Sequence, residues 1–388
     1  MKIKYNEKLK RLPPYLFIEM DKKKKEAIEK GKDIISLGVG DPDLPTPNHI
    51  VKSIQEAVIN PANHQYPFGA GLLSYREAVG KWYKRRFNVN LNIDEVCALI
   101  GSKEGIGHIH LGFVNPGDVV LVPEPCYPVY NTGTIFSDGI PYFMPLLEKN
   151  NFLPDLDVIP RDVLKKAKII FVNYPNNPTA AIAPKEFYIK LIEFAKRNNI
   201  IVASDAAYSE IYYDENEKPC SFLEFPGAKE VGVEFHSLSK TYNMTGWRIG
   251  WVCGNKDIVA GIAKVKDNYD SGVFQAIQEA AVTALSSSQE CVKNFRKIYK
   301  ERRDVLVEGL RKLDWEISSP KASFYVWAKI PNGYTSSQVV SRLLDIASIV
   351  CTPGNGMGKS GEGYVRFALT VSVPRIKEAV ERISLVKW

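Results

Sequence analysis

Lys240 stands among hydroxyl-bearing residues in a pattern that could serve a carbonyl cofactor. The stretch reads SLSKTY over residues 237–242, an apolar run over residues 231–235 precedes it, and Arg248 follows. A lysine amine can form a Schiff base with a carbonyl, while nearby hydroxyl groups and an arginine can hold a phosphate. The alternative is an ordinary loop lysine, because short motifs of this kind also occur by chance.

Asp205 and Asn177 could complete such a site. Asp205 follows an apolar run that is typical of a buried strand, where an unpaired carboxylate would be unfavourable. A cationic partner, such as a protonated pyridine nitrogen, would remove that penalty. The alternatives are structural: Asp205 could cap a helix, and Asn177 could form a turn with Pro178.

Arg366 and the loop at residues 101–105 indicate two sites for anions. Arg366 lies within the apolar run YVRFA, where an arginine suits a planar anion such as a substrate carboxylate, or else a structural ion pair. The loop GSKEG follows a predicted strand and opens a predicted helix, so its amides could cradle a phosphate together with Ser237, Ser239 and Arg248. A dinucleotide signature is absent, because Gly38-Val39-Gly40 lacks the third glycine.

The elements that must position these residues alternate between strand and helix over residues 47–275. The expected helices are residues 48–59, 73–87, 103–114 and 184–198, and the expected strands are residues 96–100, 119–122, 169–173 and 200–204. This alternation predicts an α/β fold with a mostly parallel sheet covered on both faces. Four candidate segments, residues 101–103, 174–179, 205–208 and 237–240, follow strands, and ligands of such sheets bind at the carboxyl ends of strands.

A smaller α+β domain is expected after residue 275. Its predicted helices are residues 275–286, 290–313 and 336–347, and its predicted strands are residues 323–330 and 364–369. Helix 19–30 and strand 34–37 of the amino-terminal arm are expected to complete it. The resulting division is a large domain at residues 46–282 and a small domain at residues 1–45 and 283–388, with helix 290–313 bridging them.

Composition favours an ordinary globular protein. The chain has 388 residues, of which 45% are hydrophobic and 24% charged, and a formal net charge of +7. Its densest basic cluster, Lys22–Lys25, lies between acidic residues, so it predicts a solvated helix face. Nucleic-acid binding is not predicted, because no basic stripe with interleaved aromatic residues is present.

Location and metal content are also constrained by the sequence. No signal peptide or apolar run of about 18–20 residues is present, so no membrane span is predicted. The six cysteines form no C-x-x-C pair, which favours reduced thiols in the cytoplasm. His108 and His110 would face different sides of a helix, so no metal site is predicted.

The motifs together resemble those of the class I/II aminotransferases, which are pyridoxal-phosphate enzymes of fold type I. In chain order they are G-S-K (101–103), P-x-Y-P (125–128), N-N-P-T (176–179), D-x-A-Y (205–208), S-x-S-K (237–240) and G-x-R-x-G (246–250). The resemblance covers nearly the whole chain. It implies a seven-stranded, mostly parallel sheet between helices, a smaller α+β domain, and pyridoxal 5′-phosphate as cofactor. Ala180 departs from the glycine that many relatives have there.

The resemblance also implies roles for individual residues. Lys240 would form the Schiff base, Asp205 would pair with the pyridinium nitrogen, and the catalytic group would include Tyr208. The other expected cofactor contacts are Asn177 at the phenolic oxygen, Tyr127 on the ring, and Ser102, Lys103, Ser237, Ser239 and Arg248 at the phosphate. The expected substrate contacts are Tyr15, Gly40, Lys103, Tyr127, Asn177 and Arg366. Tyr66 would reach the phosphate of a neighbouring subunit, which implies a homodimer with shared active sites.

A narrower resemblance is to the LL-diaminopimelate aminotransferases. It rests on residues 14–17, 37–41, 63–67, 205–210 and 270–275, although the loop at residues 66–71 lacks a glutamate that some members offer to the distal ammonium group. It implies a ping-pong exchange of LL-diaminopimelate and 2-oxoglutarate with tetrahydrodipicolinate and glutamate, in lysine biosynthesis. The alternatives are an alanine or other amino-acid aminotransferase and a pyridoxal-phosphate-dependent carbon–sulfur lyase. A non-enzymatic sensor domain is disfavoured, because no helix-turn-helix module precedes the fold.

Overall fold

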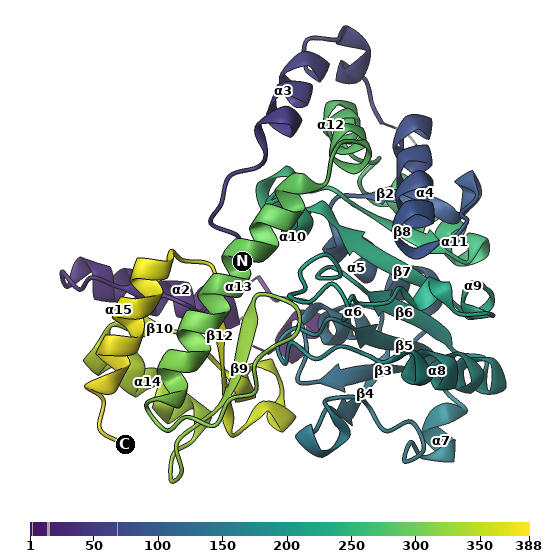
Figure 1. Ribbon diagram of the computed structural model, residues 1–388. Helices are drawn as coiled ribbons and strands as arrows, with labels where there is room; N and C mark the ends of the chain where they lie inside the picture. The colour runs from purple at the N-terminus through teal and green to yellow at the C-terminus, as the bar shows by residue number, and fades with distance from the viewer. Residues whose placement is uncertain (2, 14–15, 68) are drawn as a thin grey trace.

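A computed structural model of the chain describes residues 1, 3–13, 16–67 and 69–388 (Figure 1). Its centre is a seven-stranded sheet in the order β2-β8-β7-β6-β5-β3-β4. The strands are β2 (Val96–Leu99), β3 (Val119–Glu124), β4 (Ile140–Pro145), β5 (Ala167–Asn173), β6 (Ile201–Asp205), β7 (Gly232–Ser237) and β8 (Gly250–Gly254). β8 runs antiparallel to both neighbours, and the remaining pairs are parallel. The predicted seven-stranded, mostly parallel sheet is therefore confirmed.

Helices cover both faces of this sheet (Figure 1). The helices of this unit are α3 (Asn48–Ala57), α4 (Leu73–Phe87), α5 (Ser102–Phe113), α6 (Val129–Phe136), α7 (Arg161–Leu164), α8 (Lys185–Asn198), α9 (Ala228–Val231), α10 (Leu238–Thr241), α11 (Lys256–Tyr269) and α12 (Gln275–Ser286), of which α3 packs on α12. Strand β5 has apolar side chains on both of its faces, and helices bury each face. Ile170 and Val172 join a core with α4, α8 and α12, whereas Ile169 and Phe171 join a separate core with α5, α6 and α11. A strand whose two faces are both apolar must be buried on both.

A third hydrophobic core lies in a smaller unit. There β9 (Tyr325–Lys329), β11 (Thr352–Pro353) and β12 (Tyr364–Ala368) form an antiparallel sheet, and β1 (Ile35–Ser36) pairs in parallel with β10 (Ile349–Val350). Its helices are α2 (Leu16–Glu29), α13 (Glu290–Arg311), α14 (Ser336–Ala347) and α15 (Val373–Ser384). The β1–β10 pairing supports the prediction that the amino-terminal arm completes this unit. The exact division at residues 46–282 stays a prediction.

Short elements connect these layers. They are helix α1 (Glu7–Arg11) and 3-10 turns at Pro61–His64, Ile93–Glu95, Glu148–Asn150, Phe222–Glu224, Thr245–Trp247, Gly354–Met357 and Lys359–Gly361. α1 lies against the end of α6, where Lys8 Nζ donates to the carbonyl of Phe136 at 2.8 Å and Arg11 Nη2 to that of Ile135 at 3.1 Å. The amino-terminal arm therefore touches the large sheet unit as well as the smaller one.

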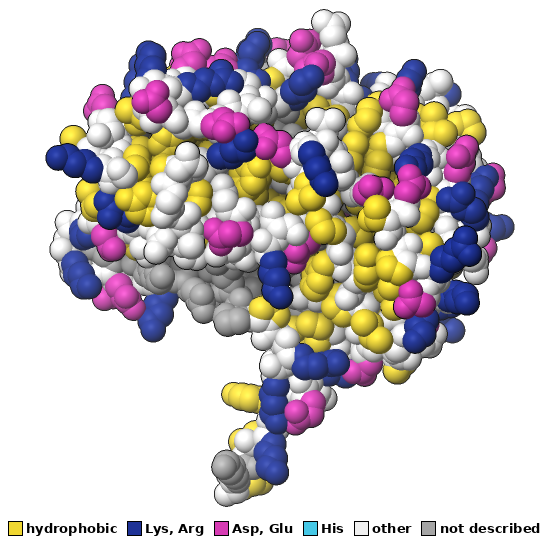
Figure 2. Space-filling model, turned by 90° about the horizontal axis from the view of Figure 1, so that it is seen from below, with side chains coloured by type: hydrophobic (Ala, Val, Ile, Leu, Met, Phe, Trp, Pro, Cys, Tyr) yellow, Lys and Arg dark blue, Asp and Glu magenta, His cyan; other side chains and the backbone are white. Residues whose placement is uncertain are grey.

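The surface mixes charges of both signs. On the face shown in Figure 2, basic and acidic side chains are interspersed, and hydrophobic side chains gather on the side of the large sheet unit. Among the described residues, no helix combines the length and apolar character needed to cross a membrane.

Candidate active site

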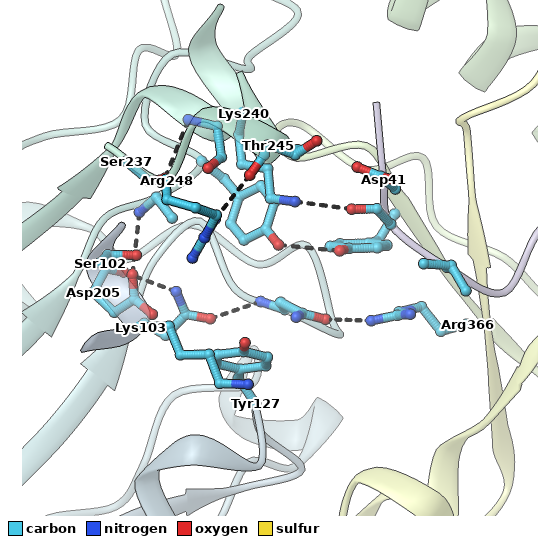
Figure 3. Close-up of a pocket in the computed structure, with 18 residues that line it drawn as sticks. Asp41, Ser102, Lys103, Tyr127, Asp205, Ser237, Lys240, Thr245, Arg248 and Arg366 are labelled. Carbon is cyan, nitrogen blue, oxygen red and sulfur yellow. Dashed lines mark hydrogen bonds between the residues drawn. The ribbon is translucent and has the colours of Figure 1, made fainter. Parts of the chain in front are cut away.

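A cavity of about 350 Å³ opens where the strand ends of the large sheet face the smaller unit (Figure 3). Its walls include most of the residues predicted from the sequence: Gly40, Ser102, Lys103, Tyr127, Asn177, Asp205, Tyr208, Ser237, Ser239, Lys240, Arg248 and Arg366. They come from both units and from segments more than 300 residues apart in the chain. The prediction that the four strand-end segments meet at one place is therefore confirmed.

Lys240 lies in α10, directly after β7. The Ser237 hydroxyl caps this short helix by accepting from the Ser239 amide at 3.2 Å. The Lys240 amine donates to the carbonyl of Gly40 at 2.9 Å. Desolvation lowers the pKa of Lys240 to about 8, and the positive charges of Arg366 and Arg248 act in the same direction. The neutral form of the amine, which a nucleophile or proton acceptor must have, is therefore far more populated near physiological pH than in an ordinary lysine.

Asp205 ends β6 and is buried. Its Oδ2 accepts from the Tyr130 hydroxyl at 2.7 Å, and its Oδ1 accepts from the Ala207 amide at 3.3 Å. Burial raises the pKa of Asp205 in spite of these hydrogen bonds. A turn follows Asp205 rather than a helix, so the helix-cap alternative is wrong. A cation placed beside the carboxylate would offset its desolvation.

Arg366 projects from β12 and is almost fully buried. Nη1 donates to Asn177 Oδ1 at 2.7 Å, and Nη2 donates to the Gly38 carbonyl at 2.6 Å and to Thr352 Oγ1 at 3.2 Å. All three of these acceptors are neutral. The guanidinium carbon also lies 4.2 Å from the centroid of the Tyr325 ring. This fixed, planar fork has the geometry that recognises a carboxylate with two hydrogen bonds.

The first turn of α5 has the groups that a second anion site needs. Gly101, with φ +71°, turns the chain into this helix, and a Cβ there would lie only 2.5 Å from Arg248 Nη2. The Arg248 guanidinium therefore packs directly on the helix start, where Ser102 also lines the cavity. The Ser239 hydroxyl is buried in this wall without a hydrogen-bond partner in the described structure. Helix amides, hydroxyl groups and a guanidinium together bind a phosphate well.

These observations test whether pyridoxal phosphate suits the cavity. The unsatisfied Ser239 hydroxyl and the Arg248 guanidinium suit its phosphate, while the buried Asp205 suits its protonated ring nitrogen. Cationic lining residues outnumber acidic ones: Lys103, Lys240, Arg248 and Arg366 against Asp41 and Asp205. The resulting positive potential favours anionic ligands. The residues present therefore fit the cofactor.

One predicted residue that the structure describes is not brought to this cavity. Tyr66 is 74% exposed and does not line it. Tyr15 lies outside the described residues. Lys103 and Tyr127 both line the cavity, with the Lys103 amine 6.0 Å from the centroid of the Tyr127 ring.

Sequence reasoning missed several residues of the site. The Tyr325 hydroxyl lies 3.0 Å from that of Tyr208, and the backbone of Gly40 lies so close that a Cβ there would meet the Tyr325 hydroxyl at 1.9 Å. Asn173 joins two strand ends, since its Nδ2 donates to the Asp205 carbonyl at 2.8 Å and its Oδ1 accepts from the Asn177 amide at 2.8 Å. Tyr325 sat within a predicted apolar strand, where nothing in its neighbours marked it as polar and functional.

Comparison with known proteins identifies the family. The family model described as aminotransferase class I and II matches residues 32–383. The chain belongs to this family. The LL-diaminopimelate aminotransferase of Aquifex aeolicus is 58% identical over 99% of each chain, and that of Moorella thermoacetica is 54% identical over 98% of this chain and 97% of its own.

Solved structures agree with the assignment. Substrate-bound BacF from Bacillus subtilis is 40% identical, covers 99% of this chain and 98% of its own, and has a TM-score of 0.95. A probable N-succinyldiaminopimelate aminotransferase from Thermus thermophilus is 33% identical over 95% of this chain and 99% of its own, with a TM-score of 0.91. The predicted fold type I architecture and aminotransferase activity are confirmed. The enzyme uses pyridoxal phosphate, as this family does.

Proposed function

We propose that this aminotransferase exchanges the amino group of LL-diaminopimelate with 2-oxoglutarate, giving tetrahydrodipicolinate and glutamate, and works in the reverse direction in lysine biosynthesis. The observation that carries this proposal is the full-length similarity, at 58% identity, to a protein named LL-diaminopimelate aminotransferase. The six cysteines are all free thiols, which supports the further proposal of a reducing, cytoplasmic location.

The residues around Lys240 would perform the proton transfers. Bound pyridoxal phosphate supplies an electron sink for the negative charge that develops on the substrate Cα. The Lys240 amine would hold the cofactor and would accept the proton from the substrate Cα. Asp205 would keep the ring nitrogen protonated, while Tyr208 and Asn177 would donate to the phenolic oxygen. The low pKa of Lys240 suits an amine that must lose and regain a proton near neutrality.

The remaining cavity residues would hold the two reactants. Ser102, Lys103, Ser237, Ser239 and Arg248 bind the phosphate, and Tyr127 packs on the ring. The substrate α-carboxylate binds to the Arg366 fork, to Asn177 and to the Gly40 amide. Lys103, Tyr127 and Tyr15 contact the rest of the substrate. A 2-keto acid then enters the same pocket, so that the two half-reactions alternate in ping-pong fashion.

A homodimer with shared active sites is part of the proposal. Tyr66 and Tyr269 are 74% and 72% exposed, and their segments touch, because the Gly69 amide donates to Asp267 Oδ1 at 3.2 Å. Exposed aromatic rings of this kind are enriched at protein interfaces. Tyr66 would then reach the phosphate site of the partner. Sedimentation velocity should show a dimer. Tyr66→Phe should weaken cofactor binding while the protein remains a dimer.

A half-reaction panel tests the substrate. Holoenzyme is mixed with single amino acids, and the absorbance of the bound cofactor is followed without any keto acid. We expect LL-diaminopimelate and glutamate to change the spectrum fully. Change with alanine and glutamate but not with LL-diaminopimelate would favour the alanine aminotransferase alternative. Ammonia release that needs no keto acid would instead indicate a carbon–sulfur lyase.

A further inference from the structure

Asp205 depends on a buried tyrosine for its placement. We propose that Tyr130 is a positioning residue of the reaction, whose hydroxyl fixes the Asp205 carboxylate where it meets the cofactor ring nitrogen. This inference rests on the role proposed above for Asp205. Tyr130 does not line the cavity, so it acts through Asp205 rather than on a reactant.

The hydrogen bond itself is short and buried. The Tyr130 hydroxyl lies 2.7 Å from Asp205 Oδ2, and both side chains are buried, Tyr130 completely. Among the residues that the structure describes, no other side chain donates to this carboxylate. A hydrogen bond to a charged acceptor is stronger than one between neutral groups, and the Tyr130 side chain is fully buried, so its hydroxyl cannot donate to bulk water instead.

A stack of three aromatic rings holds Tyr130 in place. Its ring lies 4.8 Å from that of Phe171, at an interplanar angle of 18°, and the other neighbour of Phe171 is His110, at 5.0 Å and 21°. The rings come from α6, β5 and α5, so three elements fix one hydroxyl. His110 Nδ1 lies 2.8 Å from the Ile106 carbonyl, which orients the last ring. Its burial lowers the pKa of His110 to about 4, so the stack is uncharged at working pH.

Helix α6 approaches α5 closely enough to build this stack because Gly133 has no side chain. A Cβ at that position would lie 2.4 Å from His110 Nδ1. α6 also begins two residues after Tyr127, the residue proposed to pack on the cofactor ring. Helix α6 therefore fixes the position of Tyr127 and, through Tyr130, the position of the Asp205 carboxylate.

Other charges near Asp205 do not duplicate this contact. On the adjacent strand β7, His236 Nε2 lies 3.1 Å from Glu234 Oε1, and both side chains are buried. These groups influence Asp205 through space with opposite signs. Tyr83 donates its hydroxyl to the same Glu234 oxygen at 2.9 Å. Tyr83 is thus a matched control: an equally buried tyrosine hydroxyl on a buried carboxylate that lies away from the cavity.

The test compares Tyr130→Phe with Tyr83→Phe and Asp205→Asn in the full-length holoenzyme. Tyr130→Phe keeps the ring stack and removes only the hydroxyl. We expect kcat to fall about ten-fold, the change that loss of one hydrogen bond to a charged group brings, with KM for 2-oxoglutarate within about two-fold. Tyr83→Phe should leave kcat unchanged.

Two readouts besides activity separate positioning from a structural role. The dissociation constant of pyridoxal phosphate, titrated by protein fluorescence, should rise several-fold in Tyr130→Phe. The pH at which the spectrum of the bound cofactor changes should also move. Tyr83→Phe should move both quantities far less, because Glu234 acts on Asp205 only through space. The inference would be overturned if Asp205→Asn lost activity but Tyr130→Phe kept the wild-type dissociation constant and the wild-type pH of the spectral change.

Different results would contradict the role of Asp205 and the positioning role of Tyr130. Wild-type activity in Asp205→Asn would remove the proposed role of Asp205 and the inference with it. If Tyr130→Phe does not fold, Phe171→Leu provides the second variant, because it keeps the hydroxyl and removes the middle ring. We expect a smaller loss of cofactor affinity in the same direction, and an unchanged dissociation constant would contradict the proposal.

Discussion

The two ends of the active-site cavity are built differently. At the cofactor end, Asp205, Ser237 and Ser239 are buried and stand on or directly after neighbouring strands of one sheet. At the substrate end, Gly40 and Arg366 come from the smaller unit, and the Lys103 side chain is exposed. The first end stands on one continuous sheet, while the second lies where two units meet. The chemistry is therefore held rigidly, and substrate choice can vary without disturbing it.

Replacing Lys240 should have the largest effect, because it removes the reactive group of the cofactor end. We expect Lys240→Ala to lower kcat by at least about a thousand-fold, since general-base catalysis and covalent attachment are both lost. Steady-state assays with LL-diaminopimelate and 2-oxoglutarate would measure it. The exposed Lys300 offers a control, and Lys300→Ala should behave as wild type. Transamination by Lys240→Ala at the wild-type rate would end this account.

Arg366→Lys should break the substrate end alone. The Arg366 guanidinium donates to Asn177 Oδ1 and to the Gly38 carbonyl, and its planar fork can also bind a carboxylate. The single ammonium group of a lysine cannot make all of these hydrogen bonds. Loss of two charge-assisted hydrogen bonds should lower kcat/KM for the amino acid about a hundred-fold. The dissociation constant of the cofactor should stay the same. Arg375→Lys, at an exposed pair with Asp33, is the control. Equal loss of cofactor affinity would show that the two ends are not separable.

The pH dependence of cofactor binding should follow Lys240. Burial lowers its pKa from 10.5 to about 8 in the folded protein, so the amine is protonated below that pH and neutral above it. Only the neutral amine attacks a carbonyl. The rate at which cofactor-free protein binds pyridoxal phosphate should therefore rise about ten-fold per pH unit below pH 8 and stay constant above it. Stopped-flow absorbance would measure this rate. A flat profile between pH 6.5 and 9 would contradict the assignment.

The smallest expected effect concerns the contact between the two units. Glu124, at the end of β3, accepts from the Ser360 hydroxyl at 2.7 Å and from its amide at 3.1 Å. Ser360→Ala should lower the free energy of unfolding by about 1–2 kcal/mol, because a buried carboxylate loses one donor. Ser384→Ala, which removes an exposed hydroxyl bonded to a carbonyl, is the control in urea unfolding. No difference between the two variants would show that this contact is dispensable.

The same contrast explains what the sequence could predict. Helices 73–87, 275–286 and 336–347 were predicted with the observed bounds, because long helical segments carry a clear local signal. β8 has glycine at both ends, and β4 is an edge strand containing Pro141 and Pro145, so neither resembles a buried strand. Helices α6, α11 and α15 were likewise not predicted.

Site residues divide in the same way. Lys240, Asp205 and Asn177 were predictable because each follows a strand, and parallel strand ends converge on one edge. Tyr130 and Tyr325 were not, since their roles depend on ring contacts between elements far apart in the chain. Tyr66 is placed outside the cavity of its own chain, and its assigned role requires a second subunit. Local sequence therefore predicts the cofactor end better than the substrate end.

The most direct test of the central claim is to locate the cofactor on the chain. Holoenzyme is reduced with borohydride, digested with protease and analysed by mass spectrometry. We expect the pyridoxyl group on the peptide that contains Lys240, and we expect prior incubation with LL-diaminopimelate to prevent the labelling. A label on Lys103, the other lysine that lines the cavity, would contradict the account.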